Sequence, residues 1–306
     1  MTVPVKPSEI VSIIIPTYKR PTNLERAINS AVNQTYEFIE VIVVDDNDPN
    51  TIYREQTEII ANKYNYLPNF KYVKHSRNLN GAAARNTGVK HADGDYIAFL
   101  DDDDEFYPDK ISLQISALKT MPESFAAVYS GYILRLENRI IREKYELPAG
   151  NLQLDLLKMT VALKAGSTLL IKKSVFSELH GFDTSFSRHQ DYELLIRYFE
   201  KYKIGVVKKI LVSINIDDPS SVPDGNKLTN IKEQYLRKFN DIISKYSKKN
   251  QNEIYQSHYC MIAKAFIVSK NYGNALVYIK KLIRYKPLKS RNIKLLLKTF
   301  LGMTQR

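Results

Sequence analysis

The chain has 306 residues, of which 44% are hydrophobic and 25% charged, and its net charge is +12. This length allows one large domain and a smaller one, and the composition is ordinary for a soluble globular protein. The N-terminus lacks the basic start and apolar core of a signal peptide, and no apolar run approaches the roughly 18 residues of a membrane-spanning helix. The single cysteine, Cys260, argues against a disulfide framework and fits a reducing cytoplasm, where we expect the protein.

The charge is unevenly distributed along the chain. Residues 226–306 hold 18 Lys and Arg against 3 Asp and Glu, whereas residues 1–225 hold 27 against 30. Such a break in composition is typical of a domain boundary. We therefore predict an α/β domain over residues 1–216, followed over 217–306 by a loop and a basic, all-helical region.

Strands and helices alternate through the first 121 residues. Short, apolar, β-branched or aromatic runs predict buried strands at 11–15, 39–44, 70–74 and 96–100. Helical spacing of apolar residues and capping residues predict intervening helices that end near residues 34, 64, 91 and 121. This alternation with short connections predicts a mostly parallel sheet with helices on both faces. Because crossovers are right-handed, the carboxyl ends of the strands should share one edge.

The pattern changes after Met121. Residues 126–134 and 139–145 predict a hairpin, and the stretches that follow predict a short helix at 152–158, a strand at 168–171, a helix at 190–202 and an extended segment at 206–216. Residues 217–226 are rich in Asp, Ser, Pro and Gly and predict a loop, which we interpret as a lid. Helices are then expected at 228–245, 252–269, 274–285 and 291–301.

Four consecutive aspartates, Asp101 to Asp104, follow the predicted strand at 96–100. In open α/β sheets, ligands bind at this edge of the sheet. Adjacent carboxylates repel one another unless a positive group joins them, and a divalent cation with oxygen ligands would do so. A nucleotide diphosphate can complete the coordination of such a cation. The alternative is an acidic turn that is only solvated.

Five motifs in order make the chain resemble the family 2 glycosyltransferases, which have the GT-A fold. They are Val11-Ser-Ile-Ile-Ile-Pro-Thr-Tyr18, Val43-Val-Asp-Asp46, Asn80-Gly-Ala-Ala-Ala-Arg-Asn86-Thr-Gly88, Tyr96-Ile-Ala-Phe-Leu-Asp-Asp-Asp-Asp104 with Tyr107-Pro-Asp-Lys110, and Gly181-Phe-Asp183 with Gln190-Asp-Tyr-Glu-Leu194. The resemblance covers about residues 8 to 215. It implies inverting transfer of a sugar from a nucleotide donor, most often UDP-linked.

The resemblance also implies roles for the residues of these motifs. Those that would contact the nucleotide-sugar are Pro16, Thr17, Tyr18, Asp45, Asn80, Gly81, Arg85, Asp101 and Asp102. Within this set Asp45 would accept from the base, Arg85 would contact phosphate, and Asp101 would face the ribose. Asp103 would bind Mn²⁺ or Mg²⁺, whereas Asp46 and Asp104 would have supporting roles.

Two positions depart from the family pattern. Asp191 matches the general base, but Gln190 stands where the family more often has Glu. Relatives often carry a His after the last strand, near the metal, and this chain has Ile214-Asn-Ile-Asp217 there. Asp217 would replace that His as a metal ligand, or it is an ordinary loop acid; the sequence leaves both readings open.

The basic region at 227–306 has no zinc spacing, RNA-binding signature or heptad-linked basic helix, so we expect no nucleic-acid partner. Basic and apolar residues share its last helices, which suits an anionic membrane surface. A helical cap with a solvated basic face is an equal alternative. The acceptors implied by the resemblance are saccharides or lipid-linked sugars, which would fit a peripheral location on the inner face of the cell membrane.

We therefore predict a metal-dependent, inverting hexosyl- or N-acetylhexosaminyltransferase of surface-polysaccharide synthesis. A nucleotidyltransferase acting on sugar phosphates would also use acidic metal ligands, but it needs a glycine-rich loop with Lys after the first strand. Pro16-Thr-Tyr-Lys-Arg-Pro21 does not supply that loop. A non-catalytic nucleotide-binding scaffold is the third hypothesis, and it would not require the base, metal and nucleotide positions all to be intact.

Overall fold

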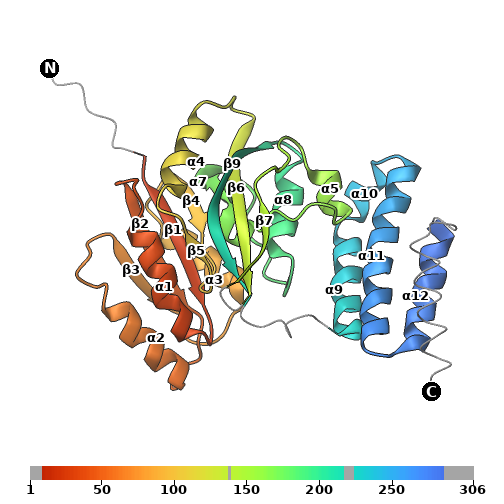
Figure 1. The fold of residues 1–306 in the computed structure, drawn as a ribbon, viewed down its shortest axis with the longest axis horizontal. Coiled ribbons are helices and arrows are strands. Elements are labelled where there is room, and N and C mark those ends of the chain that lie inside the picture. Colours follow the sequence, from red (N-terminus) through yellow and green to blue (C-terminus); the bar gives the residue numbers. More distant parts are fainter. Residues whose placement is uncertain (1–8, 137–138, 217–223, 286–306) are drawn as a thin grey trace. The chain divides into compact units, whose positions relative to one another are not determined.

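The computed structural model describes residues 9–136, 139–216 and 224–285 (Figure 1). The chain divides into two compact units. The first comprises Met1–Leu152 and Leu163–Asp217, and the second comprises Gln153–Ala162 and Asp218–Arg306. The second unit thus includes a short segment from the middle of the chain, which no feature of the sequence indicated.

One nine-stranded sheet forms the centre of the first unit, in the order β3-β2-β1-β4-β8-β6-β9-β5, with β7 paired to β6. The first four strands lie where the sequence predicts them, at β1 (Val11–Thr17), β2 (Ile39–Asp45), β3 (Phe70–Lys74) and β4 (Tyr96–Phe99). Every residue of β1, β2 and β4 is buried, as expected for parallel strands covered on both faces.

These four strands are parallel, and their register sets the binding edge. Thr17 at the end of β1 pairs with Asp45 at the end of β2, and Ile14 pairs with Phe99 at the end of β4. The carboxyl ends of the three strands therefore meet at one edge of the sheet. The sequence motifs that follow β1, β2 and β4 are brought together there, as the predicted topology requires.

The other half of the sheet is largely antiparallel. The remaining strands are β5 (Glu105–Phe106), β6 (Phe125–Leu136), β7 (Arg139–Lys144), β8 (Leu170–Lys172) and β9 (Lys203–Asn215). β8 is antiparallel to β4 and to β6, β5 is antiparallel to β9, and β6 and β9 are parallel. The mixed, mostly parallel sheet is thus confirmed in its first half, and the hairpin is confirmed as β6 and β7.

Helices cover both faces of this sheet. In Figure 1, α1 (Pro21–Val32) lies in front of β1 and β2, and α2 (Ile52–Asn62) is drawn at the lower left, below β3. The connection through α3 (Gly81–His91) returns across β2 and β1 to β4, so a right-handed crossover carries it to the opposite face. The remaining helices of the unit are α4 (Lys110–Lys119), α6 (Ala165–Thr168), α7 (Lys173–Glu178) and α8 (Gln190–Tyr198).

Two of these helices correct the sequence prediction. The strand expected at 168–171 begins two residues later, because α6 occupies Ala165–Thr168 and the Thr168 hydroxyl donates to the Leu163 carbonyl at 2.7 Å. The segment Lys173–Glu178 forms α7, which the sequence did not suggest. Four- and six-residue helices leave too little periodicity to be detected in a sequence.

The second unit is all-helical in its described residues, 153–162 and 224–285, as predicted. It contains α5 (Gln153–Leu157), α9 (Gly225–Lys238), α10 (Asn240–Ser244), α11 (Lys248–Val268) and α12 (Tyr272–Tyr285). The helix expected at 228–245 is divided at Phe239, which ends α9 and precedes α10. α5 joins this unit through its carbonyls, since Tyr235 donates to Leu156 at 3.0 Å and His258 contacts Leu157 at 2.9 Å.

Some predictions fall outside the described residues. They are the greater part of the loop at 217–226, including Asp217, and the helix at 291–301. Among the residues that are described, no helix is both long enough and apolar enough to span a bilayer.

Candidate functional site

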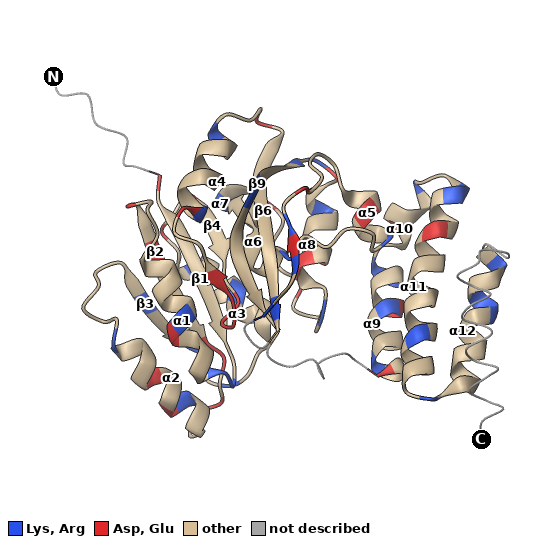
Figure 2. Ribbon diagram, viewed as in Figure 1, with Lys and Arg blue, Asp and Glu red and all other residues tan. Residues whose placement is uncertain are grey.

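The four aspartates form a tight turn between β4 and β5. The turn closes on itself through a hydrogen bond of 3.0 Å from the Asp104 amide to the Asp101 carbonyl. One carboxylate oxygen each of Asp101, Asp103 and Asp104 lies within 4.8 Å of the others. Figure 2 shows acidic residues gathered near α3, at the edge of the sheet where the strands end. The turn is therefore the strongest concentration of negative charge at that edge.

Side chains from two later segments hold this turn. The Ser167 hydroxyl donates to Oδ2 of Asp104 at 2.5 Å and accepts from the Asp101 amide at 3.1 Å. Asn215, the last residue of β9, donates from its amide to Oδ1 of Asp104 at 3.1 Å and from Nδ2 to the Asp103 carbonyl at 2.7 Å. Both oxygens of Asp104 are thus engaged by the protein, which indicates that Asp104 supports the turn.

Two arginines neutralise part of the negative charge. The guanidinium of Arg85 contacts Oδ1 of Asp101, and that of Arg20 contacts Oδ2 of Asp103. Arg20 also lies 3.2 Å from Oδ1 of Asp102, whose Oδ2 accepts from Thr17 at 2.8 Å. Burial nevertheless raises the pKa of Asp102 to about 7, although Arg20 opposes the shift. Four carboxyl groups thus share two arginine partners, and burial favours the neutral form of Asp102.

The remaining acidic charge fits a divalent cation. Burial raises the pKa of Asp104 well above its ordinary value, and the nearby charges of Asp101 and Asp103 raise it further. A bound cation would relieve that repulsion, and Mg²⁺ and Mn²⁺ prefer carboxylate oxygens as ligands. Asp103 suits the role because its side chain is 19% exposed, whereas that of Asp102 is 5% exposed.

One pocket, of about 390 Å³, lies on the side of the turn that faces β1 and α3. Eight of the nine residues predicted to bind the nucleotide-sugar line it: Pro16, Thr17, Tyr18, Asn80, Gly81, Arg85, Asp101 and Asp102. Arg20, Asp46 and Asp103 line it as well. The pocket thus gathers residues from the first four sequence motifs.

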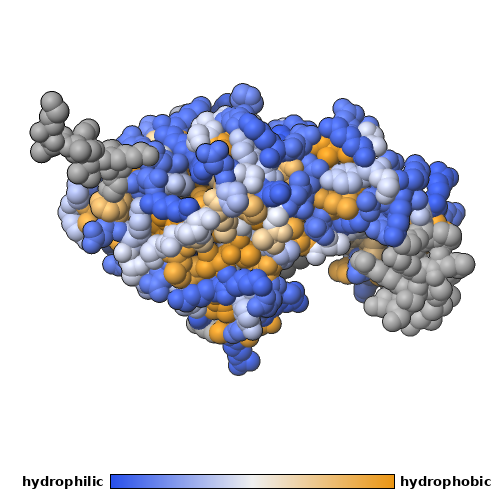
Figure 3. All heavy atoms as spheres, turned by 90° about the horizontal axis from the view of Figure 1, so that it is seen from above, coloured by the Kyte–Doolittle hydropathy of each residue, from blue (hydrophilic) through white to orange (hydrophobic). Residues whose placement is uncertain are grey.

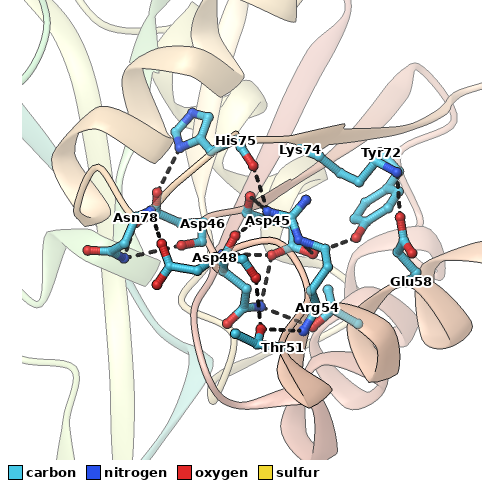
Figure 4. A network of polar contacts seen from close by, with 12 residues as sticks. Asp45, Asp46, Asp48, Thr51, Arg54, Glu58, Tyr72, Lys74, His75 and Asn78 are labelled. Carbon is cyan, nitrogen blue, oxygen red and sulfur yellow. Dashed lines mark hydrogen bonds and ion pairs between the residues drawn. The ribbon is translucent and has the colours of Figure 1, made fainter.

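Asp45 is the exception, because its side chain is fully buried away from this pocket (Figure 4). Its Oδ2 accepts from Tyr72 at 2.5 Å and lies 3.3 Å from Nε of Arg54, and its Oδ1 accepts from the Asn47 amide at 2.9 Å. Burial raises the pKa of Asp45, and these three partners oppose the shift. In the structure Asp45 thus joins β2 to β3 and α2 rather than lining this pocket, and base recognition by Asp45 stays a prediction.

Asp46 lies at the pocket wall instead. Its carboxylate accepts from the amides of Leu79 at 2.7 Å and Asn80 at 3.0 Å, and from His75 at 2.7 Å. Asp46 therefore fixes the segment that leads into α3. Asp45 ends β2 and Asp46 comes directly after it, and successive side chains of an extended chain point in opposite directions. The sequence did not indicate which of the two aspartates would face the pocket.

Asn80 and Arg85 are positioned by the start of α3. Asn80 has φ 81° and caps the helix, since its Oδ1 accepts from the amides of Ala82 at 2.9 Å and Ala83 at 3.2 Å. Asn tolerates this left-handed conformation better than most residues. One turn later Arg85 donates to the Gly81 carbonyl and to Oε1 of Gln190, both at 3.2 Å. Gln190, which departs from the family pattern, thus helps to orient Arg85.

A second pocket, of about 270 Å³, adjoins the first and contains Asp191. Asp191 lies in the first turn of α8, and burial raises its pKa, while an amide hydrogen bond and Arg85 oppose the shift. Arg85, Asp101 and Asp103 line both pockets. A ligand in the first pocket and a ligand beside Asp191 would therefore meet at the aspartate turn.

The neighbours of Asp191 have different roles. Glu193 is fully buried and forms an ion pair of 2.6 Å with Arg197, whose Nη2 also donates to the Gly181 carbonyl at 2.8 Å. Glu193 therefore anchors α8 to the preceding turn. His189 has φ 62° and lies before the helix, with its ring 5.4 Å from that of Tyr192.

Sequence reasoning missed Arg20, Ser167 and Asn215. Arg20 lies in the segment Pro16-Thr-Tyr-Lys-Arg-Pro21 and Asn215 in Ile214-Asn-Ile-Asp217. Nothing in the local sequence distinguishes either of them from a surface residue. Ser167 lies on α6, which was itself missed. Their contacts join positions 63 to 112 residues apart, so only the folded chain shows them.

Comparisons with known proteins show which family and fold this chain resembles. The family model described as "Glycosyl transferase family 2" matches residues 12–179. An uncharacterized glycosyltransferase of Rickettsia felis is 33% identical over 207 residues, which are 66% of this chain and 33% of that protein. The amylovoran biosynthesis glycosyltransferase AmsB of Erwinia amylovora is 28% identical over 191 residues, 61% of this chain and 62% of AmsB.

The solved structure of S. aureus TarS 1-349 in complex with UDP-GlcNAc superposes with a TM-score of 0.68. The sequences are 16% identical, and the match covers 96% of this chain and 89% of that one. At this identity the likeness establishes the GT-A fold alone. The chain spans about a third of the length of the first Rickettsia relatives it matches.

Proposed function

The chain belongs to glycosyl transferase family 2, and from this premise we propose that it transfers a sugar from a nucleotide-sugar to an acceptor hydroxyl, with inversion and with a divalent cation. One observation carries the proposal: the pocket lined by the nucleotide motifs and the pocket that contains Asp191 share Asp101, Asp103 and Arg85. A donor bound in one pocket and an acceptor bound in the other would have their reacting atoms beside these three shared residues. Holding reactants in this way removes much of the entropic cost of a bimolecular reaction.

The first pocket would take the donor, for which we propose a UDP-sugar. Pro16, Thr17 and Tyr18 would line the base, with Asp46 fixing the segment beside it. Arg85 would donate to the diphosphate, since a guanidinium matches phosphate oxygens in shape and charge. The TarS complex with UDP-GlcNAc, on the same fold, supports this donor class.

Asp103 would hold Mn²⁺ or Mg²⁺, with Asp101 beside the ribose and Asp217, which lies outside the described residues, as a further ligand. The cation supplies charge neutralisation for the departing nucleotide diphosphate. Asp191 would act as general base and take the proton of the acceptor hydroxyl. The acceptor oxygen then bonds to the anomeric carbon while the bond to the diphosphate breaks, and its electron pair leaves with the nucleotide.

For the acceptor we propose a saccharide or a lipid-linked sugar of a surface polysaccharide, and for the transferred group a hexosyl or N-acetylhexosaminyl unit. The relationship to AmsB, named for amylovoran biosynthesis, supports the polysaccharide assignment. Residues 1–216 would perform the chemistry. Residues 217–306 would contribute a lid and a face for anionic lipid: Figure 2 shows Lys and Arg along α9, α11 and α12, and in Figure 3 hydrophilic residues cover most of the visible, described face.

The decisive experiment is a screen of nucleotide-sugars with Mn²⁺ that measures release of nucleotide diphosphate. We expect turnover with a UDP-sugar, loss of turnover on addition of EDTA, and recovery with excess Mn²⁺. Absence of turnover with every donor, under conditions in which the protein is folded, would contradict the proposed activity. Turnover that persists in EDTA would contradict only the metal dependence.

A further inference from the structure

Arg20 lies in the turn between β1 and α1, directly before Pro21. Its Nη1 contacts Oδ2 of Asp103 and lies 3.2 Å from Oδ1 of Asp102. The side chain is 49% exposed and makes no capping bond to α1. Arg20 is therefore an accessible cation placed on two carboxylates of the aspartate turn, and these contacts hold its guanidinium within the part of the chain that the structure describes.

The oxygen of Asp103 that Arg20 occupies belongs to the carboxylate that best suits a metal ion. A guanidinium in contact with a carboxylate oxygen weakens the binding of a divalent cation to that oxygen, because the two positive charges repel. An exposed ion pair is weak and is easily exchanged. A divalent cation at this oxygen of Asp103 therefore competes with Arg20.

The same side chain lines the pocket assigned to the donor, as does Arg85. A guanidinium that leaves Asp103 remains beside that pocket, where a diphosphate would supply new acceptor oxygens. The planar fork of Arg forms paired hydrogen bonds to phosphate, and such charge-assisted bonds are stronger than neutral ones. Arg85 contacts Asp101, the Gly81 carbonyl and Gln190, whereas the guanidinium of Arg20 contacts Asp102 and Asp103.

We propose that Arg20 is a resident counter-cation that exchanges with the metal. Without donor it neutralises Asp102 and Asp103; when the cation and the nucleotide diphosphate bind, it releases Asp103 and donates to the diphosphate. This inference rests on the proposed function. It predicts that one substitution has two opposite effects, since Arg20→Gln removes a competitor of the metal and also a ligand of the diphosphate.

Adjacent positions offer matched controls. Lys19 carries the same charge in the same turn, but its Nζ lies over aromatic rings, 5.0 Å from the ring centre of Tyr18 and 5.9 Å from that of Tyr53. Lys19→Gln therefore removes one positive charge without removing a competitor. Arg20→Lys keeps a cation that can occupy Asp103 but loses the planar fork.

The first measurement is Mn²⁺ binding to the full chain without nucleotide, by electron paramagnetic resonance of free Mn²⁺. We expect Arg20→Gln to bind Mn²⁺ about three- to fivefold more tightly than the wild type, because the metal then no longer displaces an exposed ion pair, and such a pair contributes little free energy. Lys19→Gln and Arg20→Lys should remain within about twofold of the wild type on the same ground. Equal or weaker binding by Arg20→Gln, or the same tightening in Lys19→Gln, would overturn the exchange.

The second measurement is UDP binding by calorimetry at saturating Mn²⁺. Arg20→Gln should bind UDP about tenfold more weakly, and Arg20→Lys should be intermediate, while Lys19→Gln is unchanged. Unchanged UDP affinity in Arg20→Gln would overturn the contact to diphosphate. Failure of the wild type to bind Mn²⁺ would refute the proposed metal dependence together with this inference, whereas bound Mn²⁺ with equal affinities in all variants would refute the exchange alone.

Discussion

The hydroxyl of Ser167 lies 2.5 Å from Oδ2 of Asp104, a carboxylate 63 positions earlier in the chain. The hydroxyl oxygen of Ser167 also accepts from the amide of Asp101 at 3.1 Å. One small side chain therefore holds both ends of the aspartate turn. Ser167 comes from α6, a helix of four residues between β7 and β8. The turn that would receive a metal is thus shaped from outside its own sequence motif.

Replacing Ser167 with alanine should weaken both the fold and metal binding. The change leaves a buried carboxylate oxygen of Asp104 without its donor, which costs about 1–3 kcal/mol of unfolding free energy. Asp101 and Asp104 would also lose their fixed spacing, so we expect the Mn²⁺ concentration for half-maximal turnover to rise. Urea unfolding and Mn²⁺ titration measure the two effects. Ser112→Ala, which removes an exposed hydroxyl bonded to the Asp109 carbonyl, is the control and should change neither.

Asp191→Asn should abolish the proton transfer while leaving the donor bound. Loss of a general base lowers kcat by about 10²–10⁴, and the affinity for UDP should be unchanged because Asp191 does not line the donor pocket. A variant that keeps normal turnover would show that another group is the base. Glu193→Gln provides the contrast: it breaks a buried ion pair with Arg197 and should lower stability more than kcat in the folded protein.

The pH dependence of kcat follows from the same residue. Burial raises the pKa of Asp191 above its ordinary value of 3.8, and a general base is active only when deprotonated. Activity should therefore fall as pH decreases through this raised pKa and recover above it. The residual kcat of Asp191→Asn should not show this fall at low pH. A fall that persists in the variant would show that another group causes it.

Gly166 lies against Asp101, and a side chain there should disturb the site more than the fold. A Cβ at position 166 would come within 2.7 Å of Oδ2 of Asp101. Because the Asp101 side chain is 38% exposed, it can rotate away, at the expense of its contact with Arg85. We expect Gly166→Ala to raise the KM for donor several-fold with little change in melting temperature. Gly273→Ala, where a Cβ meets nothing within 4 Å, should leave KM unchanged.

The sequence predicted the first half of the sheet and the residues that line the donor pocket because both depend on local patterns. Buried strands appear as apolar runs, and parallel topology brings their ends together whatever the details of packing. Eight of nine predicted residues line one pocket for this reason. Ser167 and Asn215, which hold the aspartate turn, could not be predicted in this way. Their hydrogen bonds join positions distant in the chain, and nothing in the neighbouring sequence distinguishes these two residues.

His258 gives a pH dependence of stability in the second unit. Burial, followed by the charge of Lys232, lowers the pKa of His258 to about 3, and its Nε2 lies 2.9 Å from the Leu157 carbonyl. The unfolded chain takes up a proton near the ordinary value of 6.5, whereas the folded chain does not. Stability present above pH 6.5 is therefore lost as pH falls, by about 1.4 kcal/mol per unit, or about 2 kcal/mol at pH 5. Urea unfolding at several pH values measures this slope, which His258→Gln should remove.

Asp45 and Asp46 are adjacent, yet their substitutions should have different results. Asp45→Asn removes the charge that faces the buried Arg54, and breaking a buried pair costs about 3–5 kcal/mol of unfolding free energy. UDP affinity of the folded variant should change little, because the Asp45 side chain does not line the pocket. Asp46→Asn instead weakens the bonds that fix Leu79 and Asn80, so UDP affinity should fall. Urea unfolding and UDP calorimetry on both variants separate these effects. Normal stability with weakened UDP binding in Asp45→Asn would restore the role in base recognition that the sequence first indicated for Asp45.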